Sequence, residues 1–442
     1  MNKQKIRLDL VNYVWEDATF KARLYNDFGQ KSLKEWRDDQ SRFIKENIIL
    51  TPVETQYLLN KITKIREAVD AKHKCNEIFL CPIYKSPIPH CIVEWIEFCN
   101  LVDVKFLAEG GYGKVYSAMW TPGKITSWNE TRNAFVRKSK MVALKVFNGD
   151  DFPEDELFQE AKWNQVFTGK RTVRPFVVNI LGFTRNQEGK YMIVLDLCGG
   201  GDLRDYLQKH YKTMSWKDKI KVTWDISHDI QNIVENGSIH GDLHPGNILL
   251  LNCYMNNDWL ISDLGTCESV NESEKQEKEI MGVLPYMAPE LLCGSRKTQE
   301  SDIYSFGMIM WTISAGCVPF NDRYGDPYLV NDIICGLRPP IIPGTPKKYA
   351  DLMLKCWAKN PHDRIFANDA VQILRELLRD IIENKFIEEY SIEKNQSWNP
   401  PNLGFTVFRT SERLIISNLI NPIKELHLNS NKLILFSEIH NM

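Results

Sequence analysis

Two short acidic loops separated by an apolar run constrain this chain more than any other feature of its sequence. The first loop contains Asp242 and Asn247, with four residues between them, and the second contains Asp263. Carboxylate and amide oxygens are the hard ligands that Mg²⁺ prefers, so the spacing favours a site where Asn247 and Asp263 share a metal ion. The alternative is that these residues only make turns, as Asp and Asn often do in surface loops. Their order and separation favour the metal site.

A glycine-rich segment and a buried lysine are expected upstream of these loops. The run Leu107-Ala108-Glu109-Gly110-Gly111-Tyr112-Gly113 has glycines where a backbone would fold tightly over phosphates, although ordinary hairpin turns look similar. Residues 142–147 alternate like a strand and place Lys145 among apolar residues. A buried cation is costly without partners, so we expect anionic groups beside Lys145. The alternative is an edge-strand lysine that faces solvent.

Further segments follow downstream in a definite order. Residues 191–198 read as a buried strand, and the glycines that end at Asp202 break that strand and cap a helix. The runs Tyr286-Met287-Ala288-Pro289-Glu290, Ser301-Asp302-Ile303-Tyr304-Ser305-Phe306-Gly307 and Cys356-Trp357 through Arg364 complete the series.

In this order the segments resemble a protein kinase, with the catalytic loop around Asp242 and the magnesium loop at Asp263. The runs at 286–290 and 356–364, and Leu264 in place of phenylalanine, are most similar to the tyrosine-kinase-like branch, whose members mostly modify Ser and Thr. The resemblance implies transfer of the γ-phosphate of ATP, with Mg²⁺, to Ser or Thr hydroxyls of protein substrates, in intracellular signalling.

The resemblance also implies a role for each matched residue. Asp242, Lys145 and Asn247 would be catalytic, with Asp242 orienting the acceptor hydroxyl, and Asn247 and Asp263 would bind the metal ion. Lys145 would bind the nucleotide phosphates and pair with Glu160. The residues expected around ATP are Leu107, Ala108, Gly110, Gly111, Gly113, Val115, Ala143, Lys145, Glu160, Leu195 as gatekeeper, Asp196, Cys198 and Leu249. Away from the site, Asp302 would anchor the catalytic loop, and Arg364 would pair with Glu290.

The expected fold is α+β and two-lobed, with a small β-rich lobe that carries one key helix and a large, mainly helical lobe. Strand-like alternation dominates residues 103–148 and 176–196, whereas residues 216–236 show helical spacing behind Ser215 as a cap. We expect a kinase domain at 95–383, with lobes at 95–196 and 199–383. Residues 1–94 would form a helical N-terminal flank, and 384–442 a C-terminal tail.

Two departures from the family concern regulation. Gly241 stands where the family usually has an arginine that receives a phosphate from the activation loop, so we expect an activation segment that does not need phosphorylation. The segment 266–281 is also acidic, which would repel an added phosphate: it carries Glu268, Glu272, Glu274, Glu277 and Glu279 against Lys275 and Lys278.

Two alternatives concern activity and acceptor type. His244 replaces the lysine usual in Ser/Thr kinases, and Val283 replaces a threonine, so a dual-specificity or tyrosine kinase is an open alternative to Ser/Thr transfer. A pseudokinase scaffold that binds nucleotide or partners is the other, because a fold does not guarantee catalysis. The presence of Lys145, Asp242 and Asp263 favours an enzyme.

Composition limits the remaining function classes. A formal net charge of -2 gives no reason to expect nucleic acid as a partner, and no apolar run reaches membrane-spanning length. Eleven cysteines without tight pairing, and no visible secretory signal, favour free thiols in an intracellular, cytoplasmic protein. A zinc site formed by Cys75, Cys81, Cys91 and Cys99 is less favoured, because these cysteines lack the close pairs of structural zinc sites. The oligomeric state is left open.

The flanks and one insertion give weaker predictions. Thr51 and Glu54 form a capping box with Pro52 at the first helical position, followed by apolar residues at helical spacing, Leu58, Ile62, Ile65 and Val69. Another helix start is expected at Ser32. Residues 121–140 are polar and predict a solvent-exposed hairpin extension between two strands of the small lobe.

Overall fold

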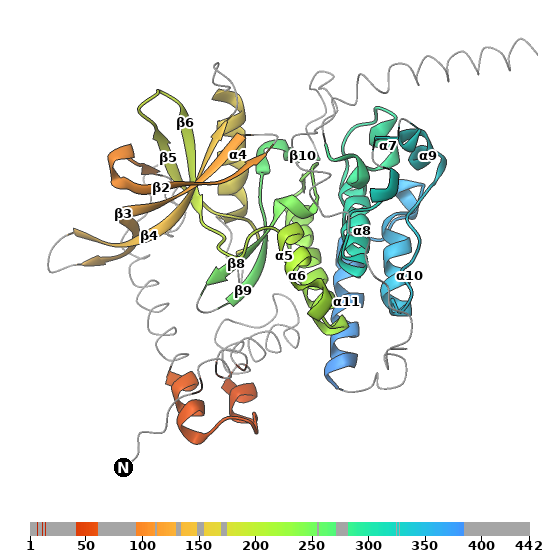
Figure 1. Cartoon of the computed structure of the whole chain (residues 1–442), viewed down its shortest axis with the longest axis horizontal. Coiled ribbons are helices and arrows are strands. Elements are labelled where there is room, and N and C mark those ends of the chain that lie inside the picture. Colours follow the sequence, from red (N-terminus) through yellow and green to blue (C-terminus); the bar gives the residue numbers. More distant parts are fainter. Residues whose placement is uncertain are drawn as a thin grey trace, which may run out of the picture.

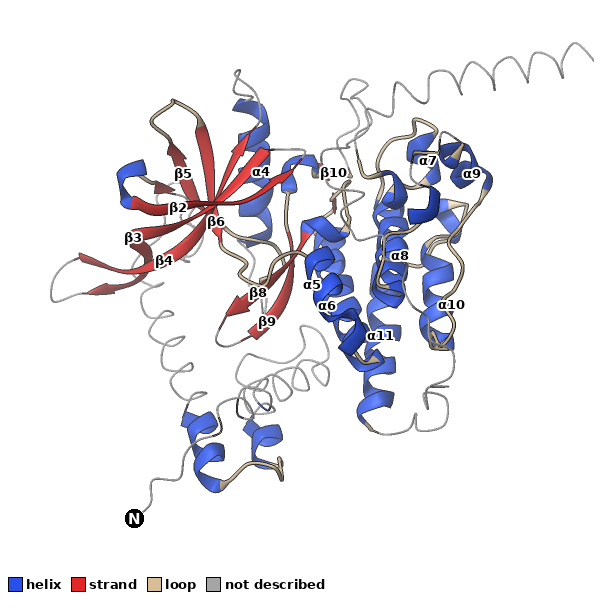
Figure 2. Cartoon of the chain, in the orientation of Figure 1, coloured by secondary structure: helices blue, strands red, loops and turns tan. Residues whose placement is uncertain are grey.

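The computed structural model describes residues 7, 11, 14, 41–60, 94–110, 113–129, 134–147, 154–168, 175–253, 256–270, 282–323, 325–326 and 328–383. Most strands gather in one lobe, together with helix α4, and most helices gather in the other (Figure 2). The two-lobed α+β fold predicted from the sequence is confirmed.

The small lobe is built on a six-stranded sheet with the strand order β1-β5-β6-β4-β3-β2. All neighbouring strands are antiparallel except β1, which pairs with β5 in parallel. An apolar cluster that includes Trp120, Leu144 and Val194 is buried against the sheet. The strands are β1 (Glu94–Trp95), β2 (Leu101–Gly110), β3 (Gly113–Asn129), β4 (Ala134–Phe147), β5 (Ile180–Arg185) and β6 (Tyr191–Asp196).

The predicted hairpin extension of the small lobe is present in the described residues. Strands β3 and β4 continue beyond the rest of the sheet, with pairs from Lys124↔Lys138 to Asn129↔Ala134 (Figure 1). Helix α4 (Glu154–Thr168) lies beside the sheet, and Asn164 fixes it there. The Asn164 amide donates to the carbonyl of Val178 at 2.6 Å and accepts from the amide of Ile180 at 2.9 Å.

The large lobe packs its helices around α8 (Gln299–Ala315), whose residues 301–315 are all buried. A helix that is buried on every side sits at the centre of a core, and α6, α10 and η6 contact it. The other α-helices of this lobe are α5 (Leu203–His210), α6 (Trp216–Glu235), α7 (Pro289–Leu292), α9 (Leu329–Cys335), α10 (Lys347–Cys356) and α11 (Ala367–Ile382), and η6 (Leu284–Tyr286) is a short 3-10 helix.

Side-chain caps begin these helices where the sequence predicted them. Asp202 accepts from the amide of Asp205 at the start of α5, and Ser215 forms a capping box with Asp218 at the start of α6. Each cap satisfies amides that the first helical turn leaves without partners. Both predicted helix starts are therefore confirmed.

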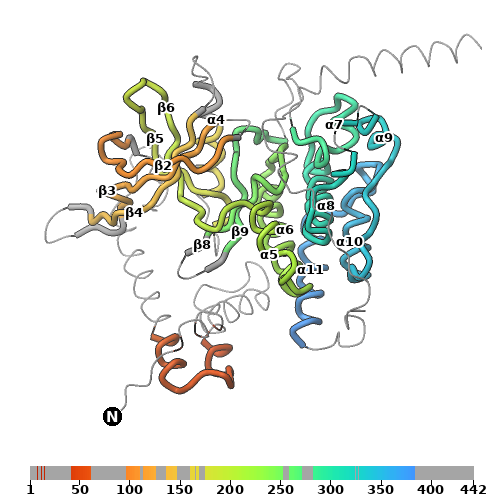
Figure 3. The backbone as a smooth tube through the Cα atoms, viewed as in Figure 1, coloured from red at the N-terminus to blue at the C-terminus, as the bar shows by residue number. Residues whose placement is uncertain are grey.

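Two short strand pairs lie near the junction of the lobes. Strands β8 (Ile248–Cys253) and β9 (Asn256–Ile261) form a hairpin that lies between the strand-rich lobe and helices α5 and α6 (Figure 3). Strand β7 (Ser238–Ile239), just before the catalytic loop, pairs with β10 (Glu268–Ser269). The backbone of Val178 also bonds to Ile261, which ties the start of β5 to the end of β9.

The described part of the N-terminal flank contains a helix at residues 52–60. The predicted capping box is present, since Glu54 accepts from the amide of Thr51 at 3.0 Å and its own amide donates to the Thr51 hydroxyl at 3.3 Å. Leu58 is buried with Ile44, Val11 and Val14. The predicted helix start at Ser32, the apolar positions Ile62, Ile65 and Val69, and the tail 384–442 lie outside the described residues.

Two predicted absences can be examined only within the described ranges. There, no helix combines the length and apolar character that crossing a bilayer requires. The same residues hold no cluster of three or more metal-ligating side chains. Of the four cysteines weighed as zinc ligands, Cys99 is a free, exposed thiol, and the other three lie outside the described residues.

Candidate active site

Lys145 on β4 is buried and meets two carboxylates from different elements. Its Nζ lies 3.0 Å from Oε2 of Glu160 on α4 and 3.0 Å from Oδ1 of Asp263. Burial alone would lower the pKa of Lys145, but the adjacent Asp263 and Glu160 carboxylates raise it above its ordinary value. The expectation of anionic partners for this lysine is confirmed, and the edge-strand alternative is excluded.

The β8–β9 hairpin explains the spacing of the two acidic loops. Ile248 pairs with Ile261, so Asn247, just before β8, lies beside Ser262, just after β9. The carbonyl of Asn247 accepts from both the amide and the hydroxyl of Ser262, at 2.8 and 3.1 Å. Asp263 follows with a left-handed backbone (φ 63°), a conformation that non-glycine residues adopt mainly at constrained or functional positions.

The loop around Asp242 is hydrogen-bonded to helix α8. Asp302 accepts from the amides of His240 and Gly241, at 2.7 and 2.9 Å, which confirms the predicted anchor. Burial raises the pKa of Asp302 to about 6, against the effect of these two bonds. Asp242 is itself 7% exposed, and burial, followed by repulsion from Asp263, raises its pKa to about 7.

Asn247 is oriented by the same loop. Its amide nitrogen donates to the backbone carbonyl of Asp242 at 2.9 Å, which leaves the amide oxygen as the atom that can ligate a cation. Asp263 lies two residues beyond Ile261, the last paired residue of β9. The site therefore presents two hard oxygen donors, the Asn247 amide oxygen and the Asp263 carboxylate. These donors fit a divalent ion such as Mg²⁺ or Mn²⁺.

The residues expected around a nucleotide come from neighbouring strands. In the glycine-rich segment, Gly110 pairs with Gly113 where β2 turns into β3, and Ala108 pairs with Val115; Gly111 lies outside the described residues. On the next strands, Ala143 pairs with Leu195, and Asp196 forms an ion pair with Lys140. Cys198 is half-buried, Leu107 is exposed, and Leu249 bridges to Asp202. The structure thus brings most of the expected residues to one side of the sheet, and their contact with nucleotide stays a prediction.

Comparison with known proteins identifies the family. Residues 101–374 match the family model of protein tyrosine and serine/threonine kinases, which covers more than half of the chain. The chain belongs to this protein kinase family. Protein kinases use ATP and a divalent metal ion, in agreement with the oxygen donors at Asn247 and Asp263.

Several relatives of this chain have names that state a kinase activity. It is 28% identical over 340 residues to the probable serine/threonine-protein kinase gdt4 of Dictyostelium discoideum, covering 75% of this chain and 19% of that protein. It is 26% identical over 309 residues to mitogen-activated protein kinase kinase kinase 7 of Drosophila melanogaster, covering 68% and 41%. The dual specificity protein kinase splA of Dictyostelium discoideum is 26% identical over 300 residues, covering 64% and 12%. The chain therefore spans less than half the length of these relatives.

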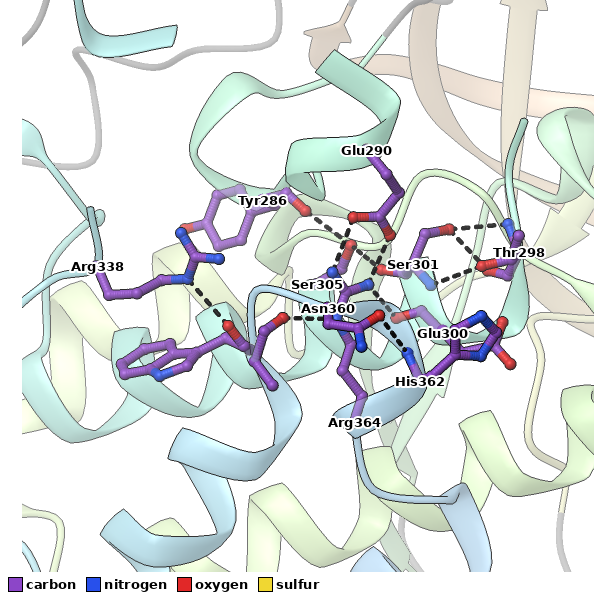
Figure 4. A network of polar contacts seen from close by, with 12 residues as sticks. Tyr286, Glu290, Thr298, Glu300, Ser301, Ser305, Arg338, Asn360, His362 and Arg364 are labelled. Carbon is purple, nitrogen blue, oxygen red and sulfur yellow. Dashed lines mark hydrogen bonds and ion pairs between the residues drawn. The ribbon is translucent and has the colours of Figure 1, made fainter. Parts of the chain in front are cut away.

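A buried ion pair stabilises the large lobe of the kinase away from the site. Arg364 donates to both Glu290 oxygens, at 2.6 and 2.8 Å, and also to the backbone of Ala358 and Glu300 (Figure 4). The Arg364 side chain has no exposed surface, so these bonds replace the water that it loses. The pairing of Arg364 with Glu290 expected from the resemblance is confirmed.

The first part of the activation segment is bound to the catalytic loop. Strand β10 pairs with β7, the Thr266 hydroxyl donates to the carbonyl of His240 at 2.8 Å, and the amide of Val270 donates to Gly237. These bonds join the first part of the activation segment to the catalytic loop, and the Lys145–Asp263 contact joins it to the small lobe. Residues 271–281, which contain most of the acidic residues of the segment, lie outside the described residues.

His244 and Lys297 are two site features that the sequence alone did not place. His244 is buried, and its Nδ1 accepts from the amide of Gly246 at 3.1 Å, so the proton of the neutral ring is on Nε2, 3.9 Å from Oδ2 of Asp242. Burial, and then the nearby Arg204, lower the pKa of His244 to about 3. The Lys297 side chain crosses over Gly241. The available signals were the unusual residues at 241 and 244.

Proposed function

We propose that this chain is an ATP-dependent protein kinase that transfers the γ-phosphate to Ser or Thr hydroxyls of protein substrates. One observation carries the proposal: four polar side chains distant in sequence, Lys145, Asp242, Asn247 and Asp263, meet where β4 and the β8–β9 hairpin approach each other. The proposed kinase domain is residues 95–383, with lobes at 95–196 and 199–383.

Each side chain has a task that follows from its position. Mg²⁺, when bound, would neutralise charge on the phosphate oxygens, and Asp263 and Asn247 are the residues proposed to hold it. Lys145, positioned by Glu160, would bind the nucleotide phosphates, and Gly110, Gly111 and Gly113 would let the backbone approach them.

Asp242 is the residue proposed to orient the acceptor hydroxyl. Its pKa of about 7 suits a group that takes a proton near neutral pH, and a bound cation beside Asp263 would offset the repulsion that helps to raise it. The adenine would lie among the side chains on the facing strands and the segment after β6: Leu107, Ala108, Val115, Ala143, Leu195, Asp196, Cys198 and Leu249.

The relatives support Ser and Thr as acceptors, since the probable serine/threonine-protein kinase gdt4 is among them. The likeness to a dual specificity kinase keeps tyrosine transfer as a second candidate. A pseudokinase scaffold is disfavoured because Lys145, Asp242 and Asp263 are all present and Lys145 pairs with Glu160. A buried cysteine outside any disulfide, such as Cys356, supports an intracellular compartment. The kinase family supports a role in signalling with protein partners, and the net charge of -2 gives no reason to expect nucleic acid.

The test is γ-phosphate transfer from ATP to a peptide library, with the acceptor residues mapped. Wild-type protein should label Ser and Thr peptides, Asp263→Asn should not, and Asp351→Asn should behave as wild type because its carboxylate is exposed on α10. Equal labelling by wild type and Asp263→Asn would remove the assignment. Labelling confined to tyrosine would replace the acceptor class.

A further inference from the structure

Lys297 occupies the space that a side chain at position 241 would fill. It lies between α7 and α8, immediately before Thr298, the residue that caps α8. Its Cδ, Nζ and Cε atoms lie 2.5, 2.8 and 3.0 Å from the point where a Cβ on Gly241 would sit. Gly241 has a left-handed backbone, with φ of 77°, which by itself favours glycine at this position.

The residue that Lys297 covers, Gly241, adjoins two buried carboxylates. Asp302 holds the amide of Gly241, and Asp242 is the next residue along the chain. Both carboxylates are less than a tenth exposed, and each repels the other. Lys297 is the cation that lowers the pKa of both, against the effect of burial. Burial lowers the pKa of His240 and raises the pKa of Cys267, and the charge of Lys297 makes a smaller, lowering contribution to both.

We propose that Lys297 is a positioning residue that supplies the catalytic loop with a built-in counter-ion. By attracting Asp302 and Asp242 from above Gly241, it holds the loop in its working geometry without a phosphate on the activation segment. The inference rests on the proposed kinase function and extends it, because it assigns the cationic role to a loop before α8 rather than to residue 241.

The surroundings favour this role over that of a phosphate receptor. The Lys297 chain is folded inwards over Gly241, so a phosphate would have to compete with the two carboxylates that already attract its ammonium. The start of the activation segment is already bound to the catalytic loop through Thr266 and strand β10. In addition, segment 266–281 carries five Glu against two Lys, so a phosphate would add to an excess of negative charge.

The experiment compares full-length variants after phosphatase treatment, with complete dephosphorylation checked by mass spectrometry. Lys297→Met and Lys297→Gln remove the charge in an apolar and a polar form, Lys297→Arg keeps it, and Lys355→Met removes an exposed lysine on α10 as a control. The kcat, the KM for ATP, the affinity for nucleotide and the Tm are measured for each.

We expect both uncharged variants to lose kcat by on the order of tenfold, with little change in the KM for ATP or in nucleotide affinity. Lys297→Arg should retain most of the activity, and dephosphorylated wild type and Lys355→Met should be fully active. If Lys297 had a merely structural role, the uncharged variants would have a lower Tm, and Lys297→Arg would not restore it.

Three results would overturn the inference while leaving the kinase assignment intact. These are an unchanged kcat in both uncharged variants, a loss that arginine does not rescue, and wild-type activity that disappears on dephosphorylation. If the last result is found, and if loss of Lys297 lowers the activity of the phosphorylated form alone, Lys297 is a phosphate receptor. Absence of transfer by wild type under all conditions would instead refute the proposed function itself, and the inference with it.

Discussion

The backbone carbonyl of Asn247 accepts two hydrogen bonds from Ser262, one from the amide and one from the hydroxyl. Through this contact the β8–β9 hairpin fixes the separation between the two side chains proposed to bind metal, Asn247 and Asp263. The rigidity of the metal site thus depends on a hairpin register and not on the loops themselves.

Ser262→Ala should weaken the metal site without abolishing activity. The amide bond to Asn247 remains, while the hydroxyl bond is lost, at a cost of about 1 kcal/mol in the free energy of unfolding. We expect the Mg²⁺ concentration for half-maximal transfer to rise severalfold, with kcat at saturating Mg²⁺ within about twofold of wild type, as for other residues that support metal ligands. A titration of activity against Mg²⁺ measures this, and an unchanged midpoint would show that the hydroxyl has no part in positioning the ligands.

Asp242→Asn should stabilise the metal-free protein while it removes transfer. Burial and the nearby Asp263 raise the pKa of Asp242 to about 7, above its value in the unfolded chain, so the folded state binds the proton more tightly. The stability that this group contributes is present below about pH 4 and is lost as pH rises through 7. The advantage of Asn should therefore grow between pH 4 and 7 and level off above.

The measurement is thermal unfolding of both proteins in a chelator, at pH values from 5 to 8. A Tm difference that is constant across this range, or that shrinks as pH rises, would contradict the raised pKa. Gain of stability with loss of activity is expected where a buried charge is kept for function.

Arg364→Ala should lower the free energy of unfolding far more than the loss of an exposed ion pair does. It leaves the Glu290 carboxylate, which is only 15% exposed, without its partner, at a cost of about 3 kcal/mol in the free energy of unfolding. Arg323→Ala is the control, because Arg323 pairs with the carboxylates of Asp326 and Asp332 but is about a quarter exposed, and its loss should cost about 1 kcal/mol or less. Denaturant unfolding of the two variants gives the comparison. Equal destabilisation would show that burial of the Glu290 pair has no special weight.

His244 accepts a hydrogen bond from Gly246 and places its Nε2–H toward Asp242, and two substitutions should separate these roles. His244→Ala leaves the amide of Gly246 without an acceptor, whereas an Asn side chain accepts from the amide two residues on and keeps that turn. Asn lacks the Nε2–H that faces Asp242. We expect Ala to lose stability and kcat together, and Asn to restore the Tm but not kcat. Full recovery of kcat in His244→Asn would show that the imidazole only shapes the loop.

Much of the fold could be predicted because it depends on local signals. The capping boxes at Thr51 and Ser215 lie within four residues, and the spacing from Asp242 to Asp263 matches two short loops around one hairpin. The pair of Arg364 with Glu290 came from resemblance, since nothing local joins residues 74 positions apart.

The contact of Lys297 with Gly241 could not be predicted in the same way. It joins two loops 56 positions apart, and it depends on how one flexible side chain folds over a glycine. The sequence does mark the place, because a glycine where a large cation is usual leaves a space that another residue can fill. Likewise, the proton position on His244 follows from a backbone amide that only the folded loop supplies.

Single-turnover phosphate transfer with Asp242→Asn tests the central claim most directly. Wild-type and variant proteins are mixed with labelled ATP, Mg²⁺ and a Ser/Thr peptide, and nucleotide binding is measured in parallel. The proposed roles predict that Asp242→Asn binds ATP as wild type does, because Lys145 and Asp263 are intact, but transfers phosphate at least about 100-fold more slowly. Equal transfer rates in the two proteins would contradict the account.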